Sequence, residues 1–143
     1  MIAYIQGDIF ESSAQVLVNA VNTVGVMGAG IALSFKNRYP AMFNEYRSLC
    51  NKKLLVPGRL YLWRGADKQV LLFPTKEHWR NPSKLEYIEL GLKEFRRTWK
   101  QLGITSIAFP KLGCGYGGLD WEKVKLLMEK YLSDLPIDIY IYV

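Results

Sequence analysis

The stretch that decides the fold runs from residue 16 to residue 36: Val-Leu-Val-Asn-Ala-Val-Asn-Thr-Val-Gly-Val-Met-Gly-Ala-Gly-Ile-Ala-Leu-Ser-Phe-Lys. An apolar strand over residues 16–18 leads to Asn19 and Asn22, then to glycines at positions 25, 28 and 30, and then to the start of an apolar helix. Glycines allow the backbone to approach a ligand closely, and the free amides at the start of a helix attract an anion. The stretch therefore predicts a pocket for a phosphorylated ligand.

This glycine-rich turn differs from the two commonest phosphate loops. It lacks the Lys-Ser/Thr ending of a P-loop, and the spacing Gly25-x-x-Gly28-x-Gly30 reverses the order of the dinucleotide fingerprint. From this stretch alone, a turn that merely connects a strand to a helix is an equal alternative.

The composition is that of one globular domain. The chain has 143 residues, of which 50% are hydrophobic and 22% charged. It contains no apolar run long enough to cross a membrane and no signal peptide, so we expect a cytoplasmic protein. Two distant cysteines, Cys50 and Cys114, and one histidine, His78, indicate reduced thiols and no metal site. No metal or redox cofactor is expected.

The charge balance is basic. Nineteen Lys and Arg residues against thirteen Asp and Glu give a net charge of +6, and the sequence pI is about 9.3. A basic surface attracts negatively charged partners. Among these it favours nucleic acid or a polyphosphate ligand over an acidic protein surface. A charge of this size is also common on soluble domains, so it does not by itself indicate DNA binding.

Strands and helices alternate along the whole chain. Apolar runs predict strands at residues 2–5, 16–20, 60–64, 69–73, 106–109 and 137–143, with a hairpin turn at 65–68. Helices are expected at residues 30–37, from Pro40 to about Cys50, from a capping box at residues 83–86 to Gly103, and after a cap at Asp120. The last two helices carry apolar residues at spacings of three and four, which predicts one buried face on each.

This alternation predicts an α/β domain with helices on both faces of one sheet. A second glycine-rich loop follows the strand at 106–109 and reads Pro110-Lys-Leu-Gly-Cys-Gly-Tyr-Gly-Gly118. Ligands of α/β sheets bind where loops converge beyond the strand ends. We expect the two glycine-rich loops to meet there and to hold one diphosphate between them.

Four segments together resemble the macrodomain family, which binds ADP-ribose. They are Gly7-Asp8-Ile9, Asn19-Ala-Val-Asn22, Gly28-Ala-Gly30-Ile-Ala32 and Pro110 to Gly118, and they extend over nearly the whole chain. Within the family, the Met27–Ala32 loop, Phe35-Lys36, Thr75-Lys76 and Pro110–Gly115 resemble the branch that contains the terminal ADP-ribose protein glycohydrolase and, most similar, the DarG antitoxin macrodomain. The resemblance implies a single macrodomain over residues 1–143, with three α/β/α layers around a mixed sheet.

The resemblance also assigns roles in binding ADP-ribose. Asp8 would accept a hydrogen bond from the adenine amino group, the Ile9 amide would lie beside it, and Tyr142 would lie against the base. The remaining ligand-binding residues would surround the diphosphate and the distal ribose; they are Asn19, Gly28, Ala29, Gly30, Ile31, Ala32, Gly113, Cys114, Gly115, Tyr116 and Gly117. An ordinary turn residue is the minor alternative for Asp8, and a core or edge-strand aromatic is an equal alternative for Tyr142.

Two residues would carry the chemistry of an enzyme. In this branch the lysine that matches Lys76 reaches the distal ribose, where it attacks the anomeric carbon or stabilises charge as the glycosidic bond breaks. Asn22 would position the distal ribose or the water beside it. Without the family pattern, Lys76 would be interpreted as a solvated loop lysine.

One departure from the family pattern bears on the substrate. The protein glycohydrolase carries an aspartate two residues after its Gly-Cys-Gly, where this chain has Gly117. The resemblance therefore favours the DarG type, whose substrate is ADP-ribose attached to a thymine base in single-stranded DNA by the toxin DarT.

The predicted activity is that of a DNA ADP-ribosyl glycohydrolase, an N-glycosidic hydrolase and antitoxin of a toxin–antitoxin system. His78, Trp79 and Arg80 would contact the DNA, unless Trp79 is buried beneath its loop. The alternatives are a non-catalytic ADP-ribose reader and a glycohydrolase acting on ADP-ribosylated protein glutamates. A monomer is expected, and DarG resemblance implies a toxin-binding region that would make this chain the N-terminal part of a longer antitoxin.

Overall fold

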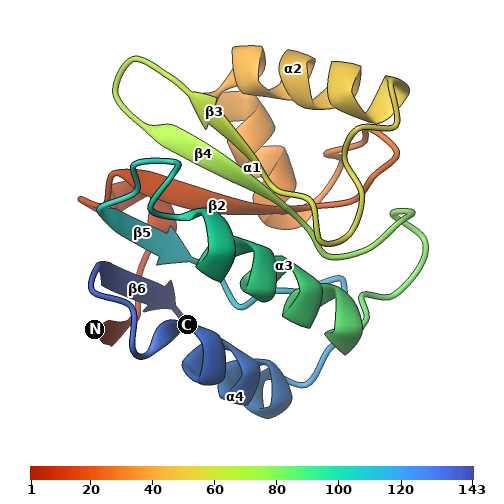
Figure 1. Cartoon of the computed structure of the whole chain (residues 1–143). Helices are drawn as coiled ribbons and strands as arrows, with labels where there is room; N and C mark the ends of the chain where they lie inside the picture. Colours follow the sequence, from red (N-terminus) through yellow and green to blue (C-terminus); the bar gives the residue numbers. More distant parts are fainter.

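The computed structural model describes all 143 residues and shows strands and helices in alternation (Figure 1). The strands are β1 (Ile2–Ile5), β2 (Val16–Val21), β3 (Tyr61–Arg64), β4 (Gln69–Pro74), β5 (Ser106–Phe109) and β6 (Asp138–Tyr142). The helices are α1 (Gly30–Arg38), α2 (Pro40–Asn51), α3 (Leu85–Thr98) and α4 (Trp121–Leu132), and a single 3-10 turn, η1, covers Ile9–Glu11. The expected order of elements is confirmed; η1 is the one element that the sequence pattern did not predict.

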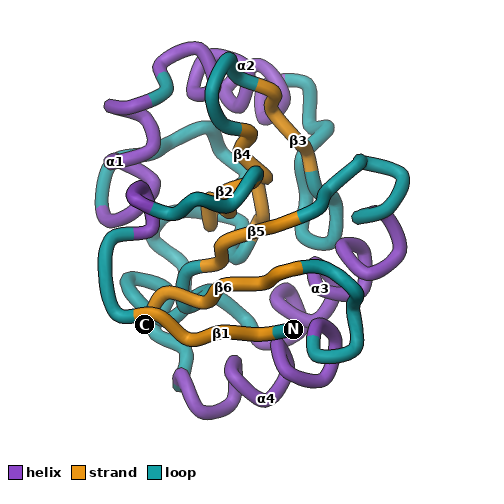
Figure 2. The backbone as a smooth tube through the Cα atoms, turned by 90° about the vertical axis from the view of Figure 1, so that its left-hand side faces the viewer, coloured by secondary structure: helices purple, strands orange, loops and turns teal.

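All six strands form one sheet in the order β1-β6-β5-β2-β4-β3. Neighbouring strands are parallel except β3, which pairs antiparallel with β4 through the predicted hairpin. Figure 2 shows the strands as a stack from β3 at the top to β1 at the bottom, with helices on either side. The sheet is therefore mixed, as the resemblance implied.

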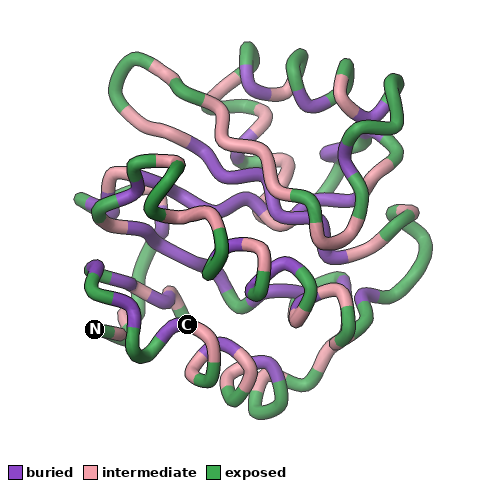
Figure 3. Tube along the Cα trace, in the orientation of Figure 1, coloured by how far each residue is buried: buried purple, intermediate pink, exposed green.

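Alternating side chains of the strands enter two separate cores. Val16 and Val18 of β2 pack with α3 and α4, whereas Leu17 and Val21 of the same strand pack with α1 and α2. All but one residue is buried in each of the central strands β2 and β4, while β3 at the edge is mostly half-buried (Figure 3). A sheet covered by helices on both faces confirms the three-layer architecture.

Helix α3 lies against β4 at a glycine. A Cβ on Gly91 would overlap the ring of Phe73, which is 0% exposed in the core. Phe73 is the last residue but one of β4. The packing requires a residue without a side chain at position 91.

Replacing Gly91 with Ala is therefore expected to destabilise the domain by about 1–3 kcal/mol, because the core has no space for the added methyl group. Thermal unfolding should show a melting temperature lower by roughly 3–10 °C. Lys93→Ala, an exposed change on the same helix, is the control and should alter stability by less than about 0.5 kcal/mol. An unchanged melting temperature for Gly91→Ala would contradict this account of the α3–β4 packing.

The predicted capping box at the start of α3 is wrong. The cap position is Lys84, with no side-chain hydrogen bond to the helix, and the Ser83 hydroxyl has no partner. The reason is a long-range contact, because the Ser83 amide donates to the Gly117 carbonyl at 3.0 Å and holds Ser83 against the second glycine loop. The cap predicted at the start of α4 is confirmed, since Asp120 Oδ1 accepts from the Glu122 amide at 3.2 Å. No helix of the structure has the length and apolar character needed to cross a membrane.

Candidate functional site

The carboxyl ends of the parallel strands open into a cleft formed by two adjoining cavities. The larger has a volume of about 810 Å³ and the smaller about 290 Å³, and they share Ile31, Pro110 and Tyr142. The larger one is lined by the segments that follow β2, β4 and β5 and by the start of α1. Both the place and the size are those of a small-molecule site in an α/β fold.

The two glycine-rich loops meet across this cleft, as the sequence predicted. Gly30 is the first residue of α1 and has a φ of +60°, a backbone conformation that favours glycine. A Cβ on Gly30 would lie 3.2 Å from the Tyr116 ring, so the second loop closes directly onto the first. Tyr116 is 78% exposed, which leaves most of its ring free at the surface of the cleft.

Asn22 follows β2 and organises the first loop. Its Oδ1 accepts from the Tyr46 hydroxyl at 2.7 Å and from the Val24 and Val26 amides at 3.1 and 3.5 Å. Its Nδ2 donates to the Val26 carbonyl at 2.8 Å. Tyr46 is fully buried in α2, and burial raises the pKa of its hydroxyl, so the hydroxyl keeps its proton. Asn22 lines the cavity, but its polar atoms are largely occupied in holding the loop.

Lys76 lies two residues beyond the end of β4 and lines the larger cavity. Its Nζ donates to the carbonyl of Trp79 at 3.3 Å, within the same loop. Partial burial lowers the pKa of the Lys76 amine from its ordinary value, because burial disfavours the charged form. The cavity therefore contains an amine with an increased neutral fraction.

The larger cavity is electropositive. Lys76 and Lys111 line it, and no Asp or Glu does. The cavity can therefore attract an anion, and its walls supply no carboxylate as a general acid or base.

The smaller cavity contains the one acidic side chain of the cleft, Asp8. One Asp8 oxygen accepts from the Phe10 amide at 2.9 Å and caps η1, while the residue stays exposed at the cavity wall. Ile9 and the half-buried Tyr142 line the same cavity. Asp8 is thus a turn residue and also has a carboxylate oxygen available to a ligand.

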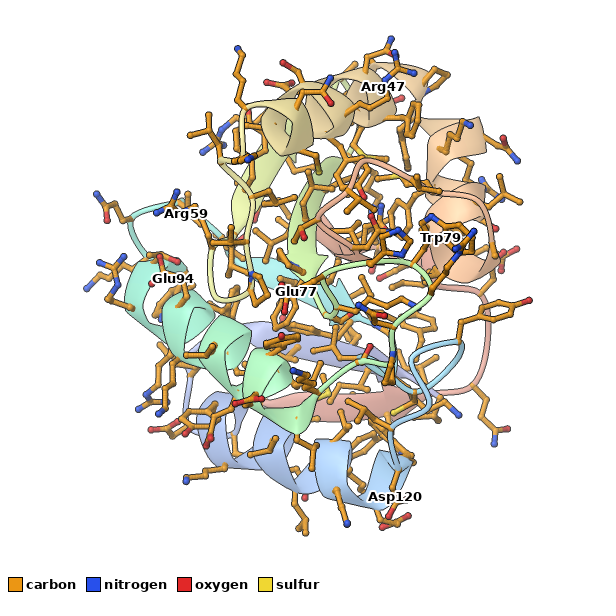
Figure 4. The ribbon with its side chains drawn as sticks, turned by 90° about the vertical axis from the view of Figure 1, so that its right-hand side faces the viewer. Arg47, Arg59, Glu77, Trp79, Glu94 and Asp120 are labelled. Carbon is orange, nitrogen blue, oxygen red and sulfur yellow. The ribbon has the colours of Figure 1, made fainter.

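An exposed aromatic residue stands at the rim next to Lys76. Trp79 lines the larger cavity and is 47% exposed, so it is not buried beneath its loop (Figure 4). The Arg80 guanidinium lies 4.7 Å from the centre of the Trp79 ring, and the His78 ring centre lies 5.2 Å away on the same loop. His78 and Arg80 themselves lie outside the cavity walls.

The structure places two predicted ligand residues elsewhere. Asn19 is 0% exposed and lines neither cavity, since its side chain points into the α1–α2 core with Leu17 and Val21 and donates to Met27 Sδ at 3.7 Å. The side chain of Cys114 packs half-buried against the other core, and burial raises the pKa of its thiol. Because side chains alternate along a strand, that of Asn19 points into the core. The side chain of Cys114 points into the other core at the turn of its loop.

Ser83 is one of several residues lining the larger cavity that were not predicted as site residues; the others are Ala20, Val21, Val26, Thr75, Pro110 and Lys111. Ser83 is 4% exposed, its Oγ has no hydrogen-bond partner, and it lies against the second glycine loop. A Cβ on Gly117 would overlap both Ser83 Oγ and the Gly113 carbonyl oxygen. Position 117 therefore accommodates no side chain, a condition that the local sequence could not reveal because Ser83 lies 34 residues earlier.

Three comparisons with known proteins agree with this geometry. The family model described as Macro domain matches residues 18–128. A DNA ADP-ribosyl glycohydrolase of Mycobacterium tuberculosis is 45% identical over 99% of this chain and 42% of its own length. The chain thus spans about two fifths of the length of the curated DNA ADP-ribosyl glycohydrolases it matches.

Solved structures show the same likeness over the whole chain. The macrodomain of Mycobacterium tuberculosis DarG superposes with a TM-score of 0.95 and 46% identity, over 99% of this chain and 97% of that one. Thermosipho africanus DarTG, solved in complex with ADP-ribose, gives a TM-score of 0.95 and 41% identity over 99% of this chain and 41% of that one.

Proposed function

The chain belongs to the macrodomain family, and we propose that it is a glycohydrolase that removes ADP-ribose from thymidine in single-stranded DNA. It would thereby reverse the modification made by a DarT-type DNA ADP-ribosyltransferase and act as an antitoxin to that enzyme. The observation that carries the proposal is the Lys76 amine, which stands in an electropositive cavity without a carboxylate. The 45% identity to a relative named DNA ADP-ribosyl glycohydrolase supports the same activity.

ADP-ribose would occupy both cavities. The adenine fits the smaller one, where the Asp8 carboxylate can accept from its amino group and the Tyr142 ring can lie against its face. The diphosphate fits between the glycine loops, whose backbone amides and the first turn of α1 favour an anion. The distal ribose would then reach Asn22 and Lys76 at the far end of the larger cavity.

Lys76 would act as a nucleophile in its neutral form. Its Nζ attacks the anomeric carbon of the distal ribose, forming a C–N bond as the bond from that carbon to the thymine nitrogen breaks. The electron pair of the broken bond leaves with the base, which takes up the proton that the amine loses. Water then replaces the lysine and releases ADP-ribose. The lowered pKa of Lys76 supports this role.

Asn22 would contribute as a positioning residue. Its hydrogen bonds hold the loop that forms the wall beside the distal ribose. The geometry of the ribose relative to Lys76 depends on that wall, and small displacements of reacting groups have large effects on rate.

Gly117 argues against a glycohydrolase acting on protein glutamates. The aspartate that the protein enzyme carries at this position would overlap Ser83 Oγ and the Gly113 carbonyl here. The cavity also contains no other carboxylate to take its place. A DNA substrate is further supported by the exposed Trp79 ring with Arg80 above it, which can stack with a base and contact a phosphate. His78, which lies beside Trp79 on the same loop, would contact the DNA on the same side as Trp79.

We propose that the domain acts as a monomer. The cytoplasm, where a bacterial chromosome lies, is the compartment in which the reaction would take place. We also propose that the domain contacts a DarT-type toxin. The relative solved in complex with ADP-ribose, from Thermosipho africanus, is a DarTG protein.

The test is incubation with two substrates, single-stranded DNA that carries ADP-ribose on thymine and protein that carries ADP-ribose on glutamate. We expect release from the DNA and little or none from the protein. Release from protein alone would contradict the DNA activity. Binding of free ADP-ribose with release from neither substrate would make the chain a non-catalytic reader.

A further inference from the structure

The positive charge of the domain is concentrated on one pair of helices. Residues 30–53, which contain α1 and α2, carry five basic side chains and one acidic side chain, Glu45. Glu45 accepts a hydrogen bond from the Tyr61 hydroxyl rather than from a basic group. All three ion pairs of the structure lie instead on the side of α3 and α4. The basic groups of α1 and α2 are therefore free to bind an anion.

Two of these basic groups are held by one aromatic ring. Lys36 Nζ lies 4.5 Å from the centre of the Phe43 ring, and Arg47 Cζ lies 5.8 Å from it. Phe43 is half-buried, so its position is fixed by the fold, while Arg47 is exposed. Cation–π contacts of this kind restrict the motion of long basic side chains and lower the entropy lost when they bind a ligand. We name Lys36, Phe43 and Arg47 the basic ridge.

The basic ridge adjoins the end of the cleft where Lys76 lies. A Cβ on Gly25 would lie 3.2 Å from Arg47 Cγ, and the next residue, Val26, lines the larger cavity. At its other end, Lys36 follows the cavity residue Ala32 by one helical turn. In Figure 4, Arg47 lies on α2 above the Trp79 loop, with Glu94 and Asp120 farther away.

The mouth of the cavity therefore has an aromatic ring with basic side chains near it. Trp79 and Arg80 lie on the loop after β4, and the basic ridge lies on α1 and α2 beside the loop that contains Gly25. A base that enters the cavity must be unpaired, and its strand must leave in two directions. Proteins that bind single strands combine basic groups for the phosphates with aromatic rings.

We propose that the basic ridge binds the phosphates of the single strand on one side of the ADP-ribosylated base. The inference rests on the proposed function, because it takes that function's DNA as the occupant, and charge complementarity supports this choice over a protein partner. Lys36 and Arg47 each contact a phosphate, and Phe43 holds both cations in place.

The test compares Lys36→Ala/Arg47→Ala with Lys123→Ala/Lys125→Ala. The control pair removes the same charge from α4, which lies at the opposite end of the molecule from α2 (Figure 1); there Lys125 lies 5.0 Å from the centre of the Tyr4 ring. The substrates are an ADP-ribosylated oligonucleotide with flanks on both sides and ADP-ribosylated thymidine without flanks. Fluorescence anisotropy with the oligonucleotide, modified and unmodified, measures affinity independently of turnover.

For the ridge variant we expect an affinity for the oligonucleotide about tenfold lower at physiological salt, and a slope of log affinity against log salt flatter by about 1.4, from two lost phosphate contacts. Release from ADP-ribosylated thymidine should not change, and the control should behave as the wild type. Phe43→Leu should lower affinity by less than the ridge variant.

Equal losses in the ridge variant and the control, or an equal loss of release from thymidine, would overturn the inference. If the wild type released ADP-ribose from neither substrate, the proposed function would fail, and anisotropy with the unmodified oligonucleotide would still decide whether the ridge binds a single strand.

Discussion

Replacing Lys76 with Ala is expected to lower the release of ADP-ribose from single-stranded DNA by about 1,000-fold or more, because the variant lacks the group that attacks the anomeric carbon. The affinity for free ADP-ribose should change by less than about fivefold, since the adenine and diphosphate sites lie elsewhere in the cleft. Single-turnover kinetics and calorimetry measure the two quantities separately. A similar loss in both would contradict a catalytic role for Lys76.

The Lys76→Arg variant and the pH profile decide how Lys76 acts. Burial lowers the pKa of the amine, so the neutral form gains population as pH rises, and a nucleophilic amine predicts turnover that rises with pH until that pKa is passed. Arginine retains the charge but does not lose its proton, so Lys76→Arg should be as inactive as Lys76→Ala. An active Lys76→Arg with turnover that falls as pH rises would show that the ammonium stabilises charge instead.

Replacing Asn22 with Ala is expected to lower turnover by about 30- to 100-fold while ADP-ribose affinity changes by less than about threefold. The variant removes one of the acceptors of the Tyr46 hydroxyl, the acceptor of the Val24 amide and the donor to the Val26 carbonyl. The wall beside Lys76 would then be held less firmly. Thermal unfolding should also show a loss of about 1–3 kcal/mol, because the Tyr46 hydroxyl, the Val24 amide and the Val26 carbonyl each lose a hydrogen bond to the Asn22 side chain.

Tyr46→Phe is the matched variant for this prediction. It keeps the ring in the α1–α2 core and removes only the hydroxyl that donates to Asn22 Oδ1. Tyr46 lines neither cavity, so the change does not alter the cavity walls directly. It should lower turnover by a smaller factor, about three- to tenfold, in the same direction as Asn22→Ala. Equal losses of turnover and of ADP-ribose affinity in Asn22→Ala would assign the loop a purely binding role.

Local patterns predicted most of the fold. The apolar residues of α3 and α4 recur at helical spacing, and Ile88, Leu92, Val124 and Met128 are indeed fully buried. Asp120 caps α4 because the cap bond joins residues two apart, which a local pattern can describe. The prediction that Ser83 caps α3 was wrong because the Ser83 amide bonds to the Gly117 carbonyl, and no local rule includes that distant partner.

The candidate site divides in the same way. Glycines 28 and 30 were predictable as cavity residues because the chain there must turn and begin a helix, and the structure places both on the cavity wall. Asn19 was predicted as a ligand residue from its neighbours in the sequence, but strand alternation directs it into the core. Lys76 was predictable only through the family resemblance, since a lone loop lysine carries no local signal.

The amino-acid sequence by itself determined the α/β/α layers and the two glycine loops, because strand alternation, helical spacing and glycine conformations act over a few residues. The tertiary structure alone decided which side chains meet. It places Tyr46 on Asn22, Ser83 against Gly117, and Arg47 beside Gly25. These partners are 24, 34 and 22 residues apart, so their contacts exist only once the sheet and its helices have packed. The lack of room for a side chain at Gly117 and the charge beside the cleft mouth are therefore properties of the folded chain.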